Sequence, residues 1–219
     1  KIYSGGKKMF GIVNYTMFFT SCLILHITPG SDTMYILGKS MSKDKKTGVV
    51  SVLGISTGVL VHTVLAAFGL SIILAKSATA FNIVKYMGAA YLVYMGIKTI
   101  LDKKTLFMND EKEEKEKLKE VYFQGVITNV LNPKVALFFL AFLPQFIDVN
   151  NNYGVIPFLL LGLSFFITSS LYGIVLALFA SSAAGVIAKK PGASKMMTKI
   201  SGCIYIFLGL SLLRAKLKS

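Results

Sequence analysis

The sequence contains no tryptophan, only two cysteines and few acidic residues outside one short stretch. Because Cys22 and Cys203 lie in separate apolar segments and no CxxC pair occurs, neither a disulfide framework nor a CxxC redox motif is expected. The chain also lacks a phosphate-binding loop, the motifs GxSxG and HExxH, and any cluster of His, Cys and carboxylates with metal-ligand spacing. These absences predict a protein that is not an enzyme and that holds no metal ion or cofactor.

The composition is that of an integral membrane protein. Of the 219 residues, 54% are hydrophobic and 16% are charged, whereas soluble domains carry about 25% charged residues. A formal charge of +14 would suggest a nucleic-acid partner in a soluble protein. Here most lysines lie in short connections between apolar segments, where they set membrane orientation. We therefore expect a lipid bilayer and no nucleic acid as a partner.

Six apolar segments follow one another along the chain. They lie at about residues 10–38, 48–75, 81–101, 121–147, 155–188 and 200–213. Since a membrane-spanning helix takes about 20 residues, the sequence predicts an all-α, polytopic membrane protein with six transmembrane helices. The stretch 102–120 holds seven of the ten acidic residues, mixed with lysines. It is expected to be a solvated cytoplasmic linker.

Two of these segments are interrupted by proline. The first contains Thr28-Pro29-Gly30 and the fourth contains Asn132-Pro133-Lys134. Proline removes an amide donor from a helix, and a buried lysine in hydrocarbon is costly. Such breaks are tolerated at membrane depth only where they face protein or a water-filled cavity. A pair of interrupted helices, one in each half of the chain, therefore indicates the binding site of a transporter.

The third and sixth segments share a glycine and tyrosine pattern that suggests an internal repeat. The pattern consists of Gly88, Tyr91 and Gly96 in the third segment and of Gly202, Tyr205 and Gly209 in the sixth. With the two proline breaks, it predicts repeat one at about residues 9–101 and repeat two at about 121–219. Repeats of three spans insert with opposite orientations, so we expect two inverted repeats.

The chain before Met9 has the character of an upstream segment. Ser4-Gly5-Gly6-Lys7-Lys8 back-translates to a bacterial ribosome-binding site directly before Met9. Residues 1–8 are therefore expected to be a non-native or upstream-translated leader, followed by a single transmembrane domain over residues 9–219. The connections after the first, third and fifth segments are rich in lysine, which places these three loops in the cytoplasm and both termini outside.

Four ionisable residues stand out inside the apolar segments: His26, Asp32, His62 and Lys134. Intramembrane charges are functional candidates by default. Asp32 and Lys134 follow the two proline breaks, so they either form an ion pair that joins the halves or bind substrate. Helix N-termini exposed by the breaks attract a carboxylate, whereas freed carbonyls and Asp32 accept an ammonium. The two histidines fit packing or a proton relay.

At these residues the sequence resembles the LysE/RhtB family of amino-acid exporters. The resemblance covers about residues 9–213. It is carried by Thr28-Pro29-Gly30 with Asp32, by Gly54 and Gly58, by Gly88-Ala89-Ala90-Tyr91-Leu92 with Gly96, and by residues 129–146. It implies a six-helix exporter of the bacterial inner or plasma membrane, driven by the membrane potential or the proton gradient. The chain departs from the family's usual Pro-Gly-Pro by carrying Ser31, which is expected to soften the first break.

The resulting hypothesis is a secondary transporter that exports amino acids, coupled to inward proton movement. The expected substrate-binding or coupling residues are Thr28, Pro29, Gly30, Asp32, Asn129, Asn132, Pro133 and Lys134. The expected helix-packing glycines are Gly54, Gly58, Gly88, Gly96, Gly202 and Gly209. Partners are then an amino acid, protons and lipid, with a homo-oligomer left open. Alternatives are a divalent cation exporter of related fold, a thiol–disulfide electron carrier and a non-transporting scaffold.

Overall fold

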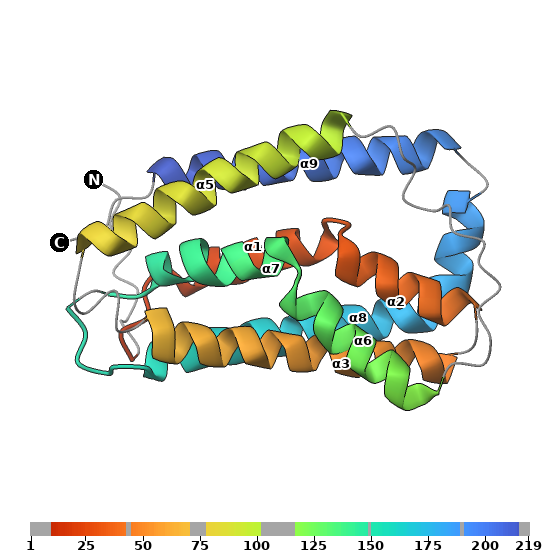
Figure 1. The fold of residues 1–219 in the computed structure, drawn as a ribbon, viewed down its shortest axis with the longest axis horizontal. Coiled ribbons are helices and arrows are strands. Elements are labelled where there is room, and N and C mark those ends of the chain that lie inside the picture. Colours follow the sequence, from red (N-terminus) through yellow and green to blue (C-terminus); the bar gives the residue numbers. More distant parts are fainter. Residues whose placement is uncertain are drawn as a thin grey trace.

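The computed structural model describes residues 10–42, 45–70, 78–101, 117–148, 150–188 and 191–214. These residues form helices and short connections, and within them the one β-type pairing is an isolated bridge between Ile12 and Ile147. The helices lie side by side along one long axis (Figure 1). The prediction of an all-α fold is confirmed. Residues 1–8 and most of the charged linker lie outside the described residues.

The helices coincide with the apolar segments, but the first and fourth segments are divided. Their bounds are α1 Tyr15–Ile27, α2 Ser31–Ser42, α3 Lys45–Leu65, η1 Ala66–Leu70, α5 Ala78–Leu101, α6 Leu118–Val130, α7 Pro133–Leu137, η2 Phe138–Phe142, η3 Leu143–Phe146, α8 Ile156–Ala188 and α9 Pro191–Arg214. The short elements η1 and η2 are π-helical, and η3 is a 3₁₀-helix. The two breaks therefore fall where the prolines predict them.

Three helix limits differ from the sequence prediction. Helix α9 begins at Pro191 instead of near residue 200, because proline is well accepted in the first turn of a helix. Helix α6 begins at Leu118, where the Lys117 amide donates to Glu120 Oε2 over 3.2 Å. Helix α2 continues to Ser42, beyond the predicted limit near residue 38, so Lys39 lies in its last turn, with its ammonium 5.6 Å from the centre of the Tyr35 ring.

Within the part of the chain that the structure describes, two stretches are long and apolar enough to cross a membrane unbroken, namely α3 with η1 and most of α8. The pair formed by α6 and the helical turns from Pro133 to Phe146, bent by 45°, passes the same test as a third span. Helix α1 is a shorter apolar helix. The structure therefore supports a membrane protein, while the number of six spans and the inverted repeats remain predictions.

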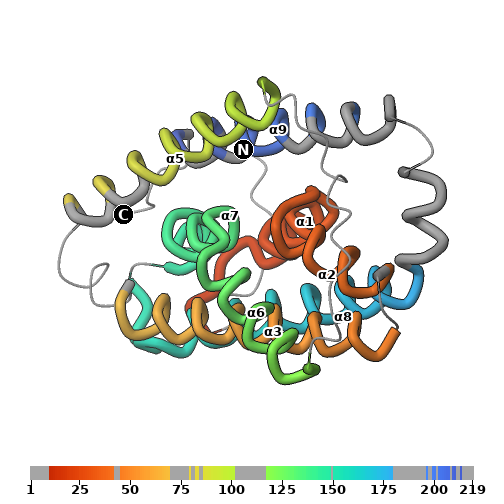
Figure 2. Tube along the Cα trace, turned by 45° about the vertical axis from the view of Figure 1, so that its right-hand side comes forward, coloured from red at the N-terminus to blue at the C-terminus, as the bar shows by residue number. Residues whose placement is uncertain are grey.

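One part of each broken helix lies in the middle of the bundle. In Figures 1 and 2, α1 and α7 lie between the α5–α9 pair and the α3–α8 pair. Aromatic side chains fill the space around the middle layer. Phe138 of η2 lies with its ring centre 5.9 Å from that of Phe18 in α1 and 4.9 Å from that of Phe165 in α8. This buried cluster fixes α1, η2 and α8 against one another.

The broken helices are also tied to each other at both ends. Before α1, the Val13 amide donates to Phe146 O over 2.8 Å, and the Asp148 amide donates to Gly11 O over 2.8 Å. Toward the other end, the Tyr35 hydroxyl of α2 donates to Val121 O of α6 over 2.6 Å. The start of the first broken helix thus meets the end of the second, so the two run in opposite directions with their breaks at the same level.

Glycines allow backbones to approach closely at two helix pairs. A Cβ at Gly54 of α3 would overlap the Tyr122 carbonyl oxygen of α6, and one at Gly58 would lie 2.6 Å from Asn129 Cβ. In the α5–α9 pair, a Cβ at Gly96 would lie 2.6 Å from Gly202 O, and one at Gly209 would lie 2.9 Å from Ala89 O. Any larger residue would push these helices apart.

We expect Gly54→Ala to destabilise the protein, because the added methyl group meets backbone atoms of α6 that cannot move aside. Overpacking of this kind costs about 1–3 kcal/mol, enough to lower the Tm in detergent by several degrees. Gly38→Ala is the matched control, since a Cβ there has no atom within 4 Å. Equal Tm values for the two variants would contradict the close α3–α6 contact.

Candidate functional site

The first break leaves a carbonyl without its helical donor. In an α-helix the carbonyl of residue i accepts from the amide of residue i+4, and for Leu25 this residue is Pro29, which has no N–H. Lys134 from the second break supplies the missing donor. Its Nζ donates to Leu25 O over 3.2 Å and to Thr28 O over 3.0 Å. The lysine ammonium therefore caps the negative end of α1.

The second break also leaves a carbonyl without its helical donor, and a side chain from another helix donates to it instead. The carbonyl of Asn129 would accept from residue 133, which is again proline. His62 Nε2 of α3 lies 3.1 Å from Asn129 O and donates to it, since a carbonyl can only accept. The Asn132 amide also donates to Asn129 O over 2.9 Å. His62 is thus a hydrogen-bonded residue that stabilises the break.

A tyrosine from α9 reaches the first break as well. The Tyr205 hydroxyl donates to Pro29 O over 3.2 Å. A Cβ at Gly30 would lie 3.2 Å from Lys134 Nζ and 3.4 Å from this hydroxyl. Gly30 therefore leaves room for both donors. The sequence predicts freed carbonyls that are open to substrate, but Lys134, His62 and Tyr205 already donate to four of them.

Asp32 does not face Lys134 as a direct partner. Among the described residues these two charges form no ion pair, and Asp32 Oδ2 instead accepts from Asn129 Nδ2 over 2.8 Å. Asn132 caps α7, since its Oδ1 accepts from the Lys134 amide over 3.0 Å. Instead of the ion pair that was one of the two alternatives, the described residues show two contacts, Asp32 with Asn129 and Lys134 with the end of α1.

Three buried polar atoms in this cluster have no hydrogen-bond partner among the described residues. They are Asp32 Oδ1, Asn129 Oδ1 and Asn132 Nδ2. Buried polar atoms are nearly always paired, and leaving one unpaired costs about 1–3 kcal/mol. Both proline breaks contribute to this group, which contains two acceptors and one donor at the level of the breaks, and the Asn132 side chain interacts with the Asp32 carboxyl group.

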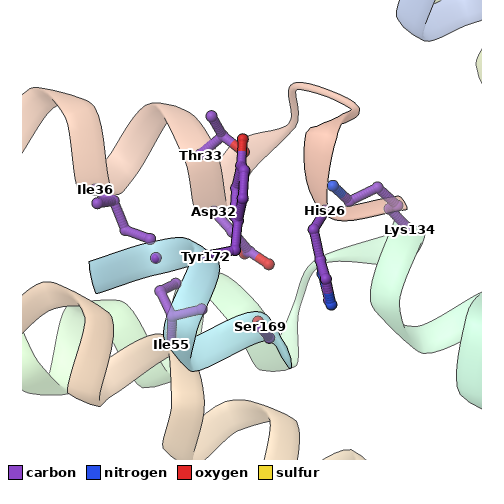
Figure 3. Close-up of a pocket in the computed structure, with 9 residues that line it drawn as sticks. His26, Asp32, Thr33, Ile36, Ile55, Lys134, Ser169 and Tyr172 are labelled. Atoms are coloured by element: carbon purple, nitrogen blue, oxygen red, sulfur yellow. The ribbon is translucent and has the colours of Figure 1, made fainter. Parts of the chain in front are cut away.

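A narrow pocket opens beside this cluster, between the breaks and α8 (Figure 3). Its walls include His26, Asp32 and Lys134, and α8 contributes Ser169 and Tyr172. The free volume, about 20 Å³, admits about one water molecule. The pocket is therefore too small for an amino acid, and a larger molecule fits only if the surrounding side chains or helices move.

The α8 face of the pocket was missed by the sequence analysis. His26 Nε2 lies 2.9 Å from Thr168 Oγ1, and its ring stacks on Tyr172 at 6.1 Å between centres. Ser169, Tyr172 and Gly173 share one face of the helix, because they are spaced three and four residues apart. Their polar and small side chains within an otherwise apolar span were the available signal.

A helical membrane bundle with two broken helices meeting in its interior is typical of secondary transporters. The comparisons with known proteins agree. The model of the family described as LysE type translocator matches residues 23–216. The chain therefore belongs to the LysE type translocator family, and it is a membrane transporter and not an enzyme.

Individual relatives are similar over different shares of the chain. The membrane protein YrhP of Bacillus subtilis is 37% identical over 134 residues, which are 58% of this chain and 64% of that protein. A membrane protein of Vibrio cholerae is 29% identical over 201 residues, 91% and 96% of the two chains. The leucine efflux protein of Salmonella typhimurium is 27% identical over 197 residues, 90% and 93% of the two chains. No solved structure matches the chain. Together these similarities support an amino-acid exporter.

We expect Lys134→Met to destabilise the protein, because the carbonyls of Leu25 and Thr28 then lose their donor in a buried place. An unpaired buried carbonyl costs about 1–3 kcal/mol, and thermal unfolding of the purified protein in detergent measures the loss. Lys98→Met is the control, since Lys98 is an exposed lysine near the end of α5. A Tm for Lys134→Met equal to that of Lys98→Met would rule out the capping role.

Proposed function

We propose that the protein exports amino acids from the cytoplasm in exchange for protons, with the substrate bound where the two helix breaks meet. The observation that carries the proposal is the group of three unpaired polar atoms in the bundle interior, on Asp32, Asn129 and Asn132. Two are acceptors and one is a donor. This combination suits a small zwitterion, whose ammonium donates and whose carboxylate accepts.

The ammonium of the substrate is assigned to Asp32 Oδ1 and Asn129 Oδ1. Its carboxylate is assigned to Asn132 Nδ2 and to the third N–H of Lys134, whose other two N–H groups bind carbonyls of α1. Opposite charges at the two ends of the site then hold the substrate in one orientation. Thr28, Pro29, Gly30 and Pro133 act indirectly in this scheme, because they shape the breaks that carry the binding groups.

Asp32 is also the proposed coupling group. An ionised Asp32 attracts the substrate ammonium, whereas a protonated Asp32 does not. A proton arriving from outside therefore favours release of the amino acid, and loss of that proton to the cytoplasm restores the binding site. Inward proton movement is thereby linked to outward amino-acid movement.

The proposed orientation follows the lysines of the sequence. The loops after the first, third and fifth segments lie in the cytoplasm and both termini lie outside. The cytoplasmic end of the first broken helix is then the end at which Tyr35 contacts Val121. The paired backbones before α1 and after η3 lie at the external end.

We expect vesicles containing the purified protein and loaded with labelled leucine to release it faster when the outside is made acidic relative to the lumen. This arrangement needs the cytoplasmic face inside the vesicle, so sidedness is checked by protease accessibility. Asp32→Asn removes the exchangeable carboxyl and is expected to abolish the response to the proton gradient. Glu120→Gln, the same change at an exposed carboxylate, serves as the control. A full gradient response in Asp32→Asn would refute the coupling role.

A further inference from the structure

The pocket beside the breaks has a polar end and an apolar end. In Figure 3, His26 and Lys134 lie on one side, Asp32 lies in the middle, and Ile36 and Ile55 lie together on the other side. Gly173 of α8 is also part of the lining. Of the groups assigned to the substrate, Asp32 and Lys134 line the pocket, in its middle and at one end, and the aliphatic walls are at the other end.

The apolar end is a buried hydrophobic surface. Ile36 and Ile55 are exposed by only 3% and 2%, and they pack with Val52 and Ala177 in one cluster. A charged group placed among these side chains would lose its hydration without gaining a partner, which is costly. An aliphatic group would bury apolar surface there, which is favourable by about 0.8 kcal/mol per CH₂.

We propose that this apolar end receives the substrate's side chain, so that the protein selects neutral amino acids with aliphatic side chains and rejects basic ones. This inference rests on the proposed function, because it takes the ammonium and carboxylate to lie near Asp32 and Lys134. Once Asp32 holds the α-ammonium, no carboxylate among the pocket residues remains for a second amino group. Lysine would then place an unpaired charge against Ile36 and Ile55.

Gly173 is the proposed determinant of side-chain length. A Cβ at this position would lie 3.4 Å from Ile36 Cδ1 and 2.9 Å from Val52 Cγ1. A methyl group added here would therefore overlap Val52 and contact Ile36, which narrows the apolar end of the pocket. Glycine at position 173 therefore lets α8 pack closely against Val52 and Ile36 at the apolar end of the pocket.

The test measures initial efflux of labelled leucine, alanine and lysine from proteoliposomes that contain the wild-type protein or a variant. One methylene in an apolar site changes discrimination about tenfold or more. Wild type is expected to prefer leucine over lysine by at least about tenfold. Gly173→Ala is expected to raise the KM for leucine about tenfold relative to that for alanine.

A second variant covers the case in which Gly173→Ala does not fold. Ile55→Val removes one methylene from the wall and is expected to improve transport of methionine relative to valine severalfold. Leu53→Val is the matched control on the same helix, because Leu53 is 54% exposed on the outside of α3. Its ratios are expected to equal those of the wild type.

The outcomes separate this inference from the proposed function. Wild-type flux that favours lysine overturns the inference but leaves amino-acid export intact. Unchanged substrate ratios in a folded Gly173→Ala or Ile55→Val variant also overturn the inference and leave amino-acid export intact. Absence of amino-acid flux from folded wild-type protein overturns both.

Discussion

The structure depends on replacing two missing amide donors. Pro29 and Pro133 each leave the carbonyl four residues earlier without its helical partner, and an unpaired carbonyl in a membrane interior costs several kcal/mol. The bundle supplies the replacements from elsewhere in the chain, with Lys134 at Leu25 O and His62 at Asn129 O. The Asn132 amide also donates to Asn129 O from within its own segment, but Lys134 and His62 come from other segments, so assembly of the bundle stabilises both breaks. Each half thereby fixes the geometry of the other.

These long-range bonds explain why small residues lie where they do. His62 can reach Asn129 only if α3 and α6 approach closely, and a Cβ at Gly58 would strike the Asn129 side chain. Gly30 plays the same part at the first break, where Lys134 and Tyr205 come within 3.4 Å of its Cβ position. The glycines therefore permit the short distances between helices that the hydrogen bonds of the polar residues require.

The sequence predicted the local features well and the long-range ones poorly. The positions of both breaks follow from proline itself, and the helices follow from continuous apolar composition, so these could be located without a structure. It was also predictable that Asp32 and Lys134 are candidate functional residues, because charged side chains in apolar segments are rare. Their partners were not, since a pairing with Asn129 or Leu25 O depends on which helices become neighbours. For the same reason, neither the contact of Tyr205 with the first break nor the pocket-lining face of α8 could be predicted from the sequence.

The resemblance to a Pro-Gly-Pro family led to the expectation that Ser31 would soften the first break. The structure shows a complete break, with α1 ending at Ile27 and Thr28 in an extended conformation at ψ 114°. One proline is sufficient, because the Lys134 ammonium and the Tyr205 hydroxyl stabilise the carbonyls that a continuous helix would have paired. A proline at position 31 would not remove a further helical bond, since the first amides of α2 have no partner within the helix. The hydrogen-bond donors that reach this break therefore determine its conformation, and the number of prolines does not. One of these donors, Lys134, also lines the pocket.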